Sequence, residues 1–177
     1  MSFGLALTLL ALTTGPDYSC PAMLAEAKRT APAMAYREFD QTEDQGWRRL
    51  AGQPCLAEAA DLIDFYRANR ADLGPSSKVN LSFHAGQLQA MAGNYAEAIK
   101  RFRTAEVNPS VPPEFKWSEY VRATIAFLQH DAEELVRNRD LIADAGSFGP
   151  NQSNLKVVDR LVANFERPYK EAIAAEK

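Results

Sequence analysis

The chain has 177 residues and a mass of 19.6 kDa, with 20 Lys and Arg against 23 Asp and Glu and a formal net charge of −3. Apolar residues make up 46% of the chain, an ordinary share for a globular protein, and the length suits a single domain. The slight acidity argues against a nucleic-acid partner, which needs a basic face, and two cysteines with two histidines leave little for a metal or cofactor site, so we expect neither.

The N-terminal segment, residues 1–16, carries no charged side chain. Its apolar run has about ten residues, whereas a membrane-spanning helix needs about 20, so we expect no membrane span. The length is typical of the apolar part of a signal peptide, although no Lys or Arg precedes it. The segment predicts an exported protein, periplasmic or secreted. The alternative is a cytoplasmic protein in which this segment is an ordinary N-terminal helix.

The two cysteines, Cys20 and Cys55, have different expected states in the two compartments. In an oxidising compartment they could form a disulfide, which would tie the N-terminal segment to the first helical unit. In the chain-entropy model, closing a loop of about 35 residues stabilises the fold by roughly 3–4 kcal/mol. In a reducing compartment they would be small buried thiols. The sequence leaves both states open.

Residues 17–177 are predicted to form one helical domain. Ala, Leu, Glu, Lys, Arg and Gln dominate this part of the chain, and these are the strong helix formers. No long stretch alternates apolar and polar residues, so strands are not indicated. Pro and Gly gather in short segments between the helical stretches. The predicted elements are an N-terminal cap at 17–39, helix hairpins at about 42–70, 78–107 and 114–143, and a C-terminal capping helix at 153–175.

A helix-start signal recurs along this domain. Asn94 and Asp131 are each followed three residues later by Glu, which is the spacing of a capping box. Cys55 stands in the same frame with a weaker cap. The three positions are 39 and 37 residues apart. The near-regular spacing predicts that one structural unit is repeated about three times.

The middle hairpin combines small and aromatic residues in a recognisable order. Gly86 is small where its two helices would cross, and Gly93 permits a tight turn between them. Tyr95, Ile99 and Phe102 fall on one helical face and would fill the space between helices. This stretch resembles a tetratricopeptide repeat, whereas the outer hairpins match that family weakly. The residues that carry the resemblance are Gly86, Gly93, Tyr95, Ala98, Phe102, Ala105 and Pro109.

The resemblance implies both a fold and a function. The implied fold is all-α, a right-handed α–α superhelix of about three tetratricopeptide-like hairpins with capping helices at both ends. The implied function is a non-enzymatic scaffold that binds a peptide or protein segment in its concave groove. Aromatic residues there could instead fill the space between hairpins. The residues expected to line the groove are Asn80, Phe83, Gln87 and Met91 from the second hairpin, and Trp117, Tyr120 and Thr124 from the third.

Three positions depart from the family pattern. His130 stands at the third turn, where a glycine equivalent to Gly93 is expected. Many family members clamp a carboxylate with Lys and Asn on the groove helices, but here His84 and Val121 occupy the expected Asn positions. We therefore do not expect the groove to select acidic chain ends.

Catalytic patterns are sparse. Cys55 and His84 would form a thiol–imidazole pair only if the fold brought them together. Asp40, Glu43 and Asp44 form an acidic cluster, which at a helix N-terminus simply favours the helix dipole. We expect no enzymatic activity. Two alternative functions are an inhibitor- or immunity-type protein that binds its partner through the outer face, and a small-ligand binder or enzyme that uses a pocket between helices.

Overall fold

The protein is described by a computed structural model in which residues 19–146 and 148–174 are placed. Within these residues every element is a helix, and no helix is long and apolar enough to cross a membrane. The predicted signal peptide at 1–16 lies outside the described residues. The helices are α1 (Cys20–Thr30), the 3-10 helix η1 (Ala31–Ala33), α2 (Tyr36–Gln41), α3 (Gly46–Ala51), α4 (Leu56–Asn69), α5 (Pro75–Met91), α6 (Tyr95–Ala105), α7 (Trp117–Leu128), α8 (Ala132–Ala143), α9 (Gly149–Ala163) and α10 (Tyr169–Ala174).

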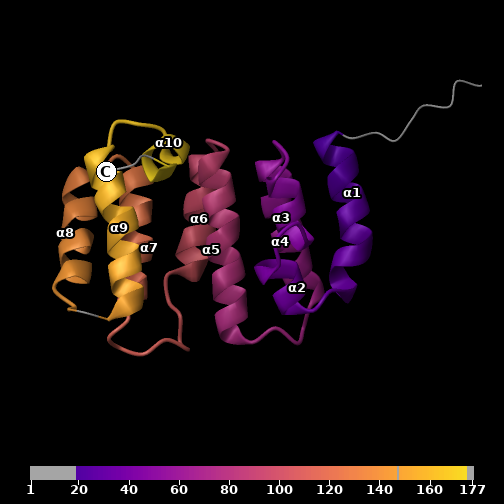
Figure 1. Cartoon of the computed structure of the whole chain (residues 1–177), viewed down its shortest axis with the longest axis horizontal. Coiled ribbons are helices and arrows are strands. Elements are labelled where there is room, and N and C mark those ends of the chain that lie inside the picture. The colour runs from indigo at the N-terminus through magenta and orange to yellow at the C-terminus, as the bar shows by residue number, and fades with distance from the viewer. Residues whose placement is uncertain (1–18, 147, 175–177) are drawn as a thin grey trace, which may run out of the picture.

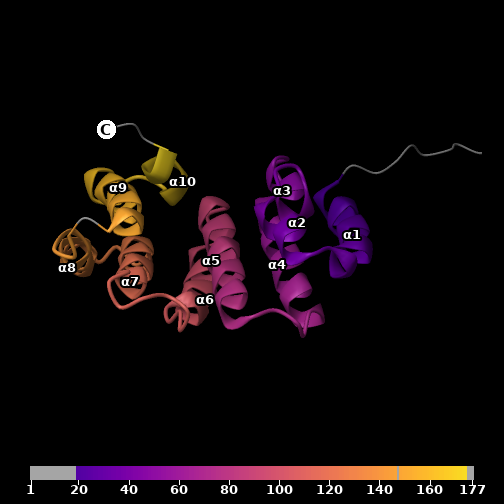
Figure 2. The same cartoon turned by 60° about the horizontal axis from the view of Figure 1, so that its bottom comes forward.

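From α1 to α8 the helices broadly follow one another in chain order along the long axis of the molecule, whereas α9 and α10 turn back beside α7 and towards α5 (Figure 1). Helices α3 and α4, α5 and α6, and α7 and α8 pack in consecutive pairs, in the places predicted for the three hairpins. Figure 2 shows α2 and α3 at one end and α9 and α10 at the other, all standing on the same side of α4 to α7. We call this side, on which α5 lies recessed between the two groups, the inner side.

Helix α5 separates two buried clusters. Leu81, Ala85 and Leu88 belong to one of them, which we call the N-terminal core, and Val79 and Phe83 belong to the other, the C-terminal core. Because both sides of α5 are covered, 9 of its 17 residues are buried. The N-terminal core contains Ala31, Phe39, Trp47, Leu50, Cys55, Ala59, Ala60, Leu62, Ile63, Tyr66, Leu73, Leu81, Ala85 and Leu88. The C-terminal core is built around Phe83, Phe102, Trp117, Tyr120, Phe127 and Tyr169.

The first hairpin begins later than predicted. The expected helix from Thr42 is interrupted by a loop, and α3 begins only at Gly46. Asp44 and Gly46 adopt positive φ angles of 57° and 50°, which a right-handed helix does not allow. A Cβ atom at Gly46 would lie 2.1 Å from the carbonyl oxygen of Phe39, so only glycine fits this close approach. The predicted cap at 17–39 is accordingly divided into α1, η1 and α2.

The turns of the second and third hairpins share one backbone geometry. Gly93 has φ +83° in the second turn, and His130 has φ +56° at the corresponding point of the third. In both turns the next backbone N–H, that of Asn94 or Asp131, donates to the carbonyl five residues earlier at 2.9 Å. His130 therefore adopts the left-handed conformation at the position where the resemblance to the repeat family predicts a glycine.

The predicted helix caps have different outcomes. The Asp131 carboxylate accepts a hydrogen bond from the Glu134 backbone N–H at 2.9 Å, which confirms that cap. Asn94 does not cap α6, because its amide donates to the Gln89 side chain at 2.8 Å instead. Cys55 makes no cap hydrogen bond, and its sulfur is bonded in a disulfide. Asp131 is thus the only one of the three that acts as an N-cap, and even there the capping box is incomplete, because the Asp131 N–H donates to Ala126 and the Glu134 carboxylate accepts from Arg137 and Asn138.

The C-terminal cap is two helices, not the single helix predicted at 153–175. Helix α9 begins four residues earlier, with Pro150 in its first turn, where a missing N–H costs no helical hydrogen bond. The chain leaves the helix after α9, and α10 begins directly after Pro168, whose ring blocks continuation of the preceding turn. Val158 and Leu161 of α9 are fully buried in the C-terminal core, so this segment does cover the end of the core.

The crossing of α5 and α6 depends on the small residue at Gly86. A Cβ atom there would lie 2.8 Å from the ring of Phe102, which is itself fully buried. Ala98, on the facing side of α6, is also fully buried. The interpretation of Gly86 as the small residue at this crossing is confirmed, because the Phe102 ring occupies the space of a side chain at position 86.

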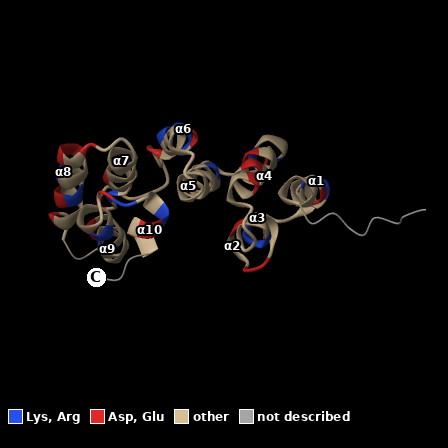
Figure 3. Ribbon diagram, turned by 90° about the horizontal axis from the view of Figure 1, so that it is seen from above, with Lys and Arg blue, Asp and Glu red and all other residues tan. Residues whose placement is uncertain are grey.

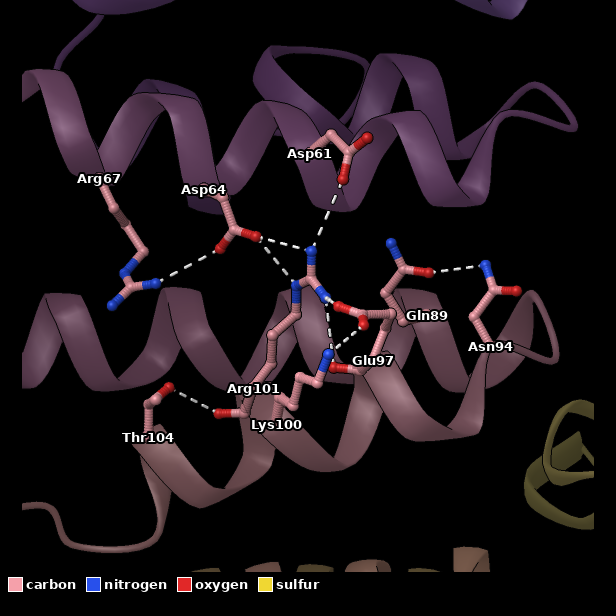
Figure 4. A network of polar contacts seen from close by, with 9 residues as sticks. All are labelled: Asp61, Asp64, Arg67, Gln89, Asn94, Glu97, Lys100, Arg101 and Thr104. Carbon is pink, nitrogen blue, oxygen red and sulfur yellow. Dashed lines mark hydrogen bonds and ion pairs between the residues drawn. The ribbon is translucent and has the colours of Figure 1, made fainter.

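Polar contacts join α4 to α6 on the outer side of α5 (Figure 4). The Arg101 guanidinium of α6 forms an ion pair with Asp64 of α4 at 2.8 Å and a longer one with Asp61 at 3.6 Å. It also contacts Glu97 of its own helix at 3.2 Å. Because the Arg101 side chain is only 15% exposed, these contacts satisfy a mostly buried charge and fix α6 beside α4.

Candidate functional site

Four of the residues expected to line a groove are buried instead. Each of them is at most 9% exposed to solvent: Phe83, Trp117, Tyr120 and Thr124. The Phe83 ring packs against Trp117 and Tyr120, with ring centroids 4.9 and 5.3 Å away. The Trp117 indole donates to the carbonyl oxygen of Ala105 at 2.7 Å. The prediction that these four side chains face a partner is therefore corrected: they fill the space between the second and third hairpins.

The other expected groove residues, Asn80, Gln87 and Met91, remain partly exposed. With His84 they stand four, three and four residues apart, so all four lie in one row along a single face of α5. We call this row the α5 face. It carries two amides, an imidazole and a thioether, and it bears no permanent charge.

Figure 3 shows α2, α3, α9 and α10 on one side of α5, and side chains of the α5 face contact α2, α3 and α10 of this inner side. At the centre of the α5 face, His84 bonds to Asp40 of α2 and lies against the Trp47 ring of α3, with centroids 5.5 Å apart. One turn further on, the Gln87 side chain lies near the Tyr169 hydroxyl of α10 and slightly opposes the rise in the pKa of Tyr169 that burial causes. The two flanking groups of helices thus reach the α5 face from opposite ends.

Asp40 is the buried centre of a polar cluster. Its side chain is fully buried, and Oδ1 accepts from His84 Nδ1 at 2.7 Å and from Trp47 Nε1 at 2.9 Å. Its other oxygen accepts from the Tyr36 hydroxyl at 3.1 Å and from the Gln41 amide. All four partners donate, so every hydrogen bond favours the ionised carboxylate.

The cluster shifts the acidity of two groups. Burial raises the pKa of Asp40, but the hydrogen bond and charge of His84, with the donors of Trp47 and Gln41, outweigh it and leave that pKa below its ordinary value. Burial and the neighbouring Asp40 charge raise the pKa of Tyr36. Because the carboxylate only accepts, it fixes the proton of His84 on Nδ1 and leaves Nε2 available for another group.

This pair was not predicted from the sequence. The sequence predicts an acidic cluster of Asp40, Glu43 and Asp44 at a helix N-terminus, but Asp40 lies near the C-terminal end of α2 and is buried. Asp40 and His84 are 44 positions apart and lie in different units, so no local spacing links them. Both oxygens of the buried Asp40 are occupied by donors from other side chains.

A pocket of about 600 Å³ lies between α1, η1 and α3. Its lining is largely apolar, with Leu62 of α4 among the residues. Charged and polar side chains, including Arg49 and Asp44, also line it. A volume of this size lies within the range of about 300–1,000 Å³ that is usual for small-molecule sites. The apolar lining consists of Ala22, Met23, Ala27, Ala31, Met34, Gly46, Leu50 and Leu62.

A disulfide joins Cys20 and Cys55 next to this pocket, with their Cα atoms 5.3 Å apart. Since Cys55 is bonded to Cys20, it cannot form the thiol–imidazole pair with His84 that the sequence left open. In the described part of the chain no group of three or more His, Cys, Asp and Glu residues is arranged to hold a metal ion. Comparison of the chain with known protein families, curated proteins and solved structures gave no match.

Proposed function

We propose that this protein is a non-enzymatic binding module, exported and built from divergent tetratricopeptide-like hairpins, which binds a peptide or protein segment along its inner side. The observation that carries the proposal is the α5 face, a row of partly exposed side chains between two raised groups of helices. Its residues are Asn80, His84, Gln87 and Met91.

The repeat character of the hairpins supports the tetratricopeptide-like part of the proposal. Gly93 and His130, 37 residues apart, occupy the same left-handed position of two turns with the same hydrogen bonds. Gly86 and Ala98 provide the close helix crossing that the family uses. The first hairpin departs from this geometry, because its turn residue Gly52 has an ordinary φ of −68°.

The bond between Cys20 and Cys55 supports the proposed export. Disulfides persist in oxidising compartments such as the periplasm or the extracellular space and are rare in a reducing cytosol. The bond ties the first described helix to the start of α4, so it stabilises the part of the protein that flanks the α5 face.

The chemistry of the α5 face suits an extended peptide backbone. Amide side chains such as Asn80 and Gln87 both donate and accept, as a peptide group does. His84, held in one tautomer by Asp40, presents Nε2 as a further polar atom in a fixed orientation. Met91 offers a flexible apolar contact for a side chain of the partner. The proposed ligand is therefore an uncharged, extended segment and not an acidic chain end.

Selection from a display library of random peptides tests this proposal. Peptides that bind the wild-type protein should lose about tenfold or more in affinity for a Gln87→Ala, Met91→Ala double variant, since truncating a central contact typically costs more than 1 kcal/mol. The matched control is Lys78→Ala, an exposed position on the opposite face of the same helix. Affinity for the control should equal that of the wild type.

A second control separates this proposal from an inhibitor-type protein that binds through its outer face. Glu133 and Arg137 are exposed on α8, far from the α5 face in sequence. If substitutions there abolish binding while the Gln87→Ala, Met91→Ala variant binds normally, the partner surface is on the outer side and the proposal is wrong. Failure to select any peptide with the wild-type protein would also contradict it.

A further inference from the structure

Helix α1 leaves its inward side incompletely covered. None of its 11 residues is buried, although Met23, Leu24 and Ala27 point to the N-terminal core and pack against it. Two of these three, Met23 and Ala27, line the 600 Å³ pocket. If α1 only covered the N-terminal core, its inward side chains Met23 and Ala27 would be buried. They remain partly exposed because they line the pocket.

The walls of the pocket are held apart from both ends. At the start of α1, the disulfide from Cys20 to Cys55 anchors the helix to α4. At the far end, the carbonyl oxygen of Met34 accepts hydrogen bonds from the Tyr66 hydroxyl at 3.0 Å and from the Arg70 guanidinium. These two attachments fix α1 and η1 relative to α4, which contributes Leu62 to the lining.

The third wall is a loop with a constrained backbone. Asp44 and Gly46 both have positive φ, and Gly46 is packed directly against the Phe39 backbone. Non-glycine residues in this conformation cost of order 1–3 kcal/mol and tend to occur where surrounding structure holds a functional shape. The loop contributes Asp44, Gln45 and Gly46 to the lining.

The charges of the pocket restrict the head group of a ligand. Arg49 is the one cationic residue in its lining, and among the described residues it forms no ion pair. Glu26 is already paired with Arg29. Asp44 supplies a negative charge that disfavours a head group with more than one negative charge. A single carboxylate on an apolar body can pair with Arg49, and it complements this lining better than a phosphate or a dicarboxylate, which Asp44 and Glu26 would repel more strongly.

We propose that this pocket binds an unbranched aliphatic monocarboxylate, with its chain between α1 and α3 and its carboxylate at the Arg49 guanidinium. Met23, Met34, Leu50 and Leu62 would contact the chain, and the two flexible methionines can adapt to its length. This site is separate from the α5 face and does not depend on a protein partner.

Calorimetric titration of the full chain with octanoate and decanoate tests the site. Each added methylene should raise the affinity about fourfold while the chain still finds apolar surface. Decanol and decyltrimethylammonium, which lack the carboxylate, should bind more weakly than decanoate. Arg49→Gln should lower the affinity for decanoate about two- to fivefold and leave that for decanol unchanged. The matched control Arg37→Gln, an exposed cation of α2 outside the lining, should have no effect.

Filling the pocket gives the stronger test. Ala27→Phe should reduce decanoate binding about tenfold or more, because the ring occupies the space of the chain. Ala25→Phe, on the exposed side of the same helix, controls for the larger side chain. Equal binding by the Ala27→Phe and wild-type proteins, with the melting temperature of the variant retained, would falsify the proposal. No detectable decanoate binding by the wild-type protein would do the same, and neither result bears on peptide binding at the α5 face.

Discussion

The two cores on either side of α5 are stabilised in different ways. The N-terminal core combines a disulfide, the stacked rings of Phe39 and Tyr66 at 3.7 Å, and the buried carboxylate of Asp40. The C-terminal core is filled by contacts among aromatic rings, with Phe83 touching Phe102, Trp117 and Tyr120. Burial in this cluster raises the pKa of Tyr120 to about 12.

Helix length contributes to this difference, although the C-terminal core also includes the six-residue α10. Helices α2 and α3 have six residues each, whereas α7 and α8 have twelve each. Short helices bury little apolar surface and gain little from their own hydrogen bonds, so other interactions must hold them in place. The disulfide and the Asp40 cluster supply those interactions. The comparison teaches that the N-terminal half has room for a pocket because covalent and polar contacts, and not only dense packing, maintain its shape.

The largest expected effect is loss of the disulfide. The Cys20→Ala, Cys55→Ala variant should lose about 3–4 kcal/mol in free energy of unfolding, since its unfolded chain is no longer cross-linked. Urea unfolding measures the change, and each core contains one tryptophan, Trp47 or Trp117, as a local probe. In Trp117→Phe protein, where Trp47 reports, the transition should move to lower urea.

The reciprocal probe gives the control for this experiment. In Trp47→Phe protein, where Trp117 reports on the C-terminal core, removal of the disulfide should move the transition less. If both tryptophans report the same shift in the urea midpoint, the two cores unfold as one cooperative unit. The difference in how they are stabilised would then have no effect on unfolding.

The next largest effect is expected from Asp40→Asn. The Asp40 carboxylate accepts hydrogen bonds with both oxygens, from the side chains of His84, Trp47, Tyr36 and Gln41. An asparagine has only one accepting oxygen, so some of these buried donors would lose their acceptor. We expect a loss of about 2–4 kcal/mol, measured by urea unfolding at neutral pH. A loss below about 1 kcal/mol would show that the cluster does not hold α2 and α3 to α5.

The same variant predicts a pH dependence. The pKa of Asp40 is lower in the folded protein than in the unfolded chain, where it is about 4. Its contribution to stability is therefore complete above about pH 4 and is lost as the pH falls through the folded-state pKa. The difference in unfolding free energy between wild type and Asp40→Asn should therefore shrink as the pH is lowered from about 5 to about 2. These limits lie about one unit above and about two units below the pKa of Asp40 in the unfolded chain. A difference that stays constant over this range would contradict the assigned cause.

A smaller effect is expected in the C-terminal core from Gly86→Ala. The new methyl group would meet the Phe102 ring at 2.8 Å, and overpacking of this kind typically costs about 1–3 kcal/mol. Thermal or urea unfolding measures the loss. Gly149→Ala is the matched control, because no atom lies within 4 Å of a Cβ there. Equal stability of the two variants would mean that the α5–α6 crossing can widen freely.

The smallest effect is expected from Gly93→Ala. No neighbouring atom opposes a Cβ at this position, so only the positive φ of 83° disfavours alanine. The expected loss is about 1–2 kcal/mol. Gly149→Ala, at a helical position with equally open space and no positive φ, should be neutral or slightly stabilising. A neutral Gly93→Ala variant would show that this turn can relax out of the left-handed conformation.

Local patterns were enough to predict the hairpins. Gly86 and Gly93 mark the crossing and the turn of the second hairpin, and the third follows from the Asp131 cap. The break before α3 was not predicted, because the close approach of Gly46 to Phe39 involves a contact that spacing alone does not reveal. In the same way Asn94 has a typical capping position, yet its amide is taken by Gln89.

The candidate site was predicted only in part. Asn80, Gln87 and Met91 are partly exposed on one face of α5, but Phe83 of the same helix is buried. Helical periodicity predicts which residues share a face of a helix, but it does not predict which of those faces a neighbouring hairpin covers. The role of Trp117 differs for the same reason, since its ring packs against Phe83 from the adjacent hairpin.

The sequence by itself determined the helical character, the second and third hairpins and the tight crossing at Gly86, because propensity, turn residues and periodicity act between residues close together in the chain. It did not determine the break before α3 or the division of the C-terminal segment into α9 and α10. Only the tertiary structure decided that Asp40 meets His84, that Cys20 meets Cys55, and that a pocket remains beside α1. The two bonds join residues 44 and 35 positions apart, and the pocket brings together side chains of α1, α3 and α4. Such contacts form only once the helices have taken their relative positions, which depend on how all the side chains between them pack.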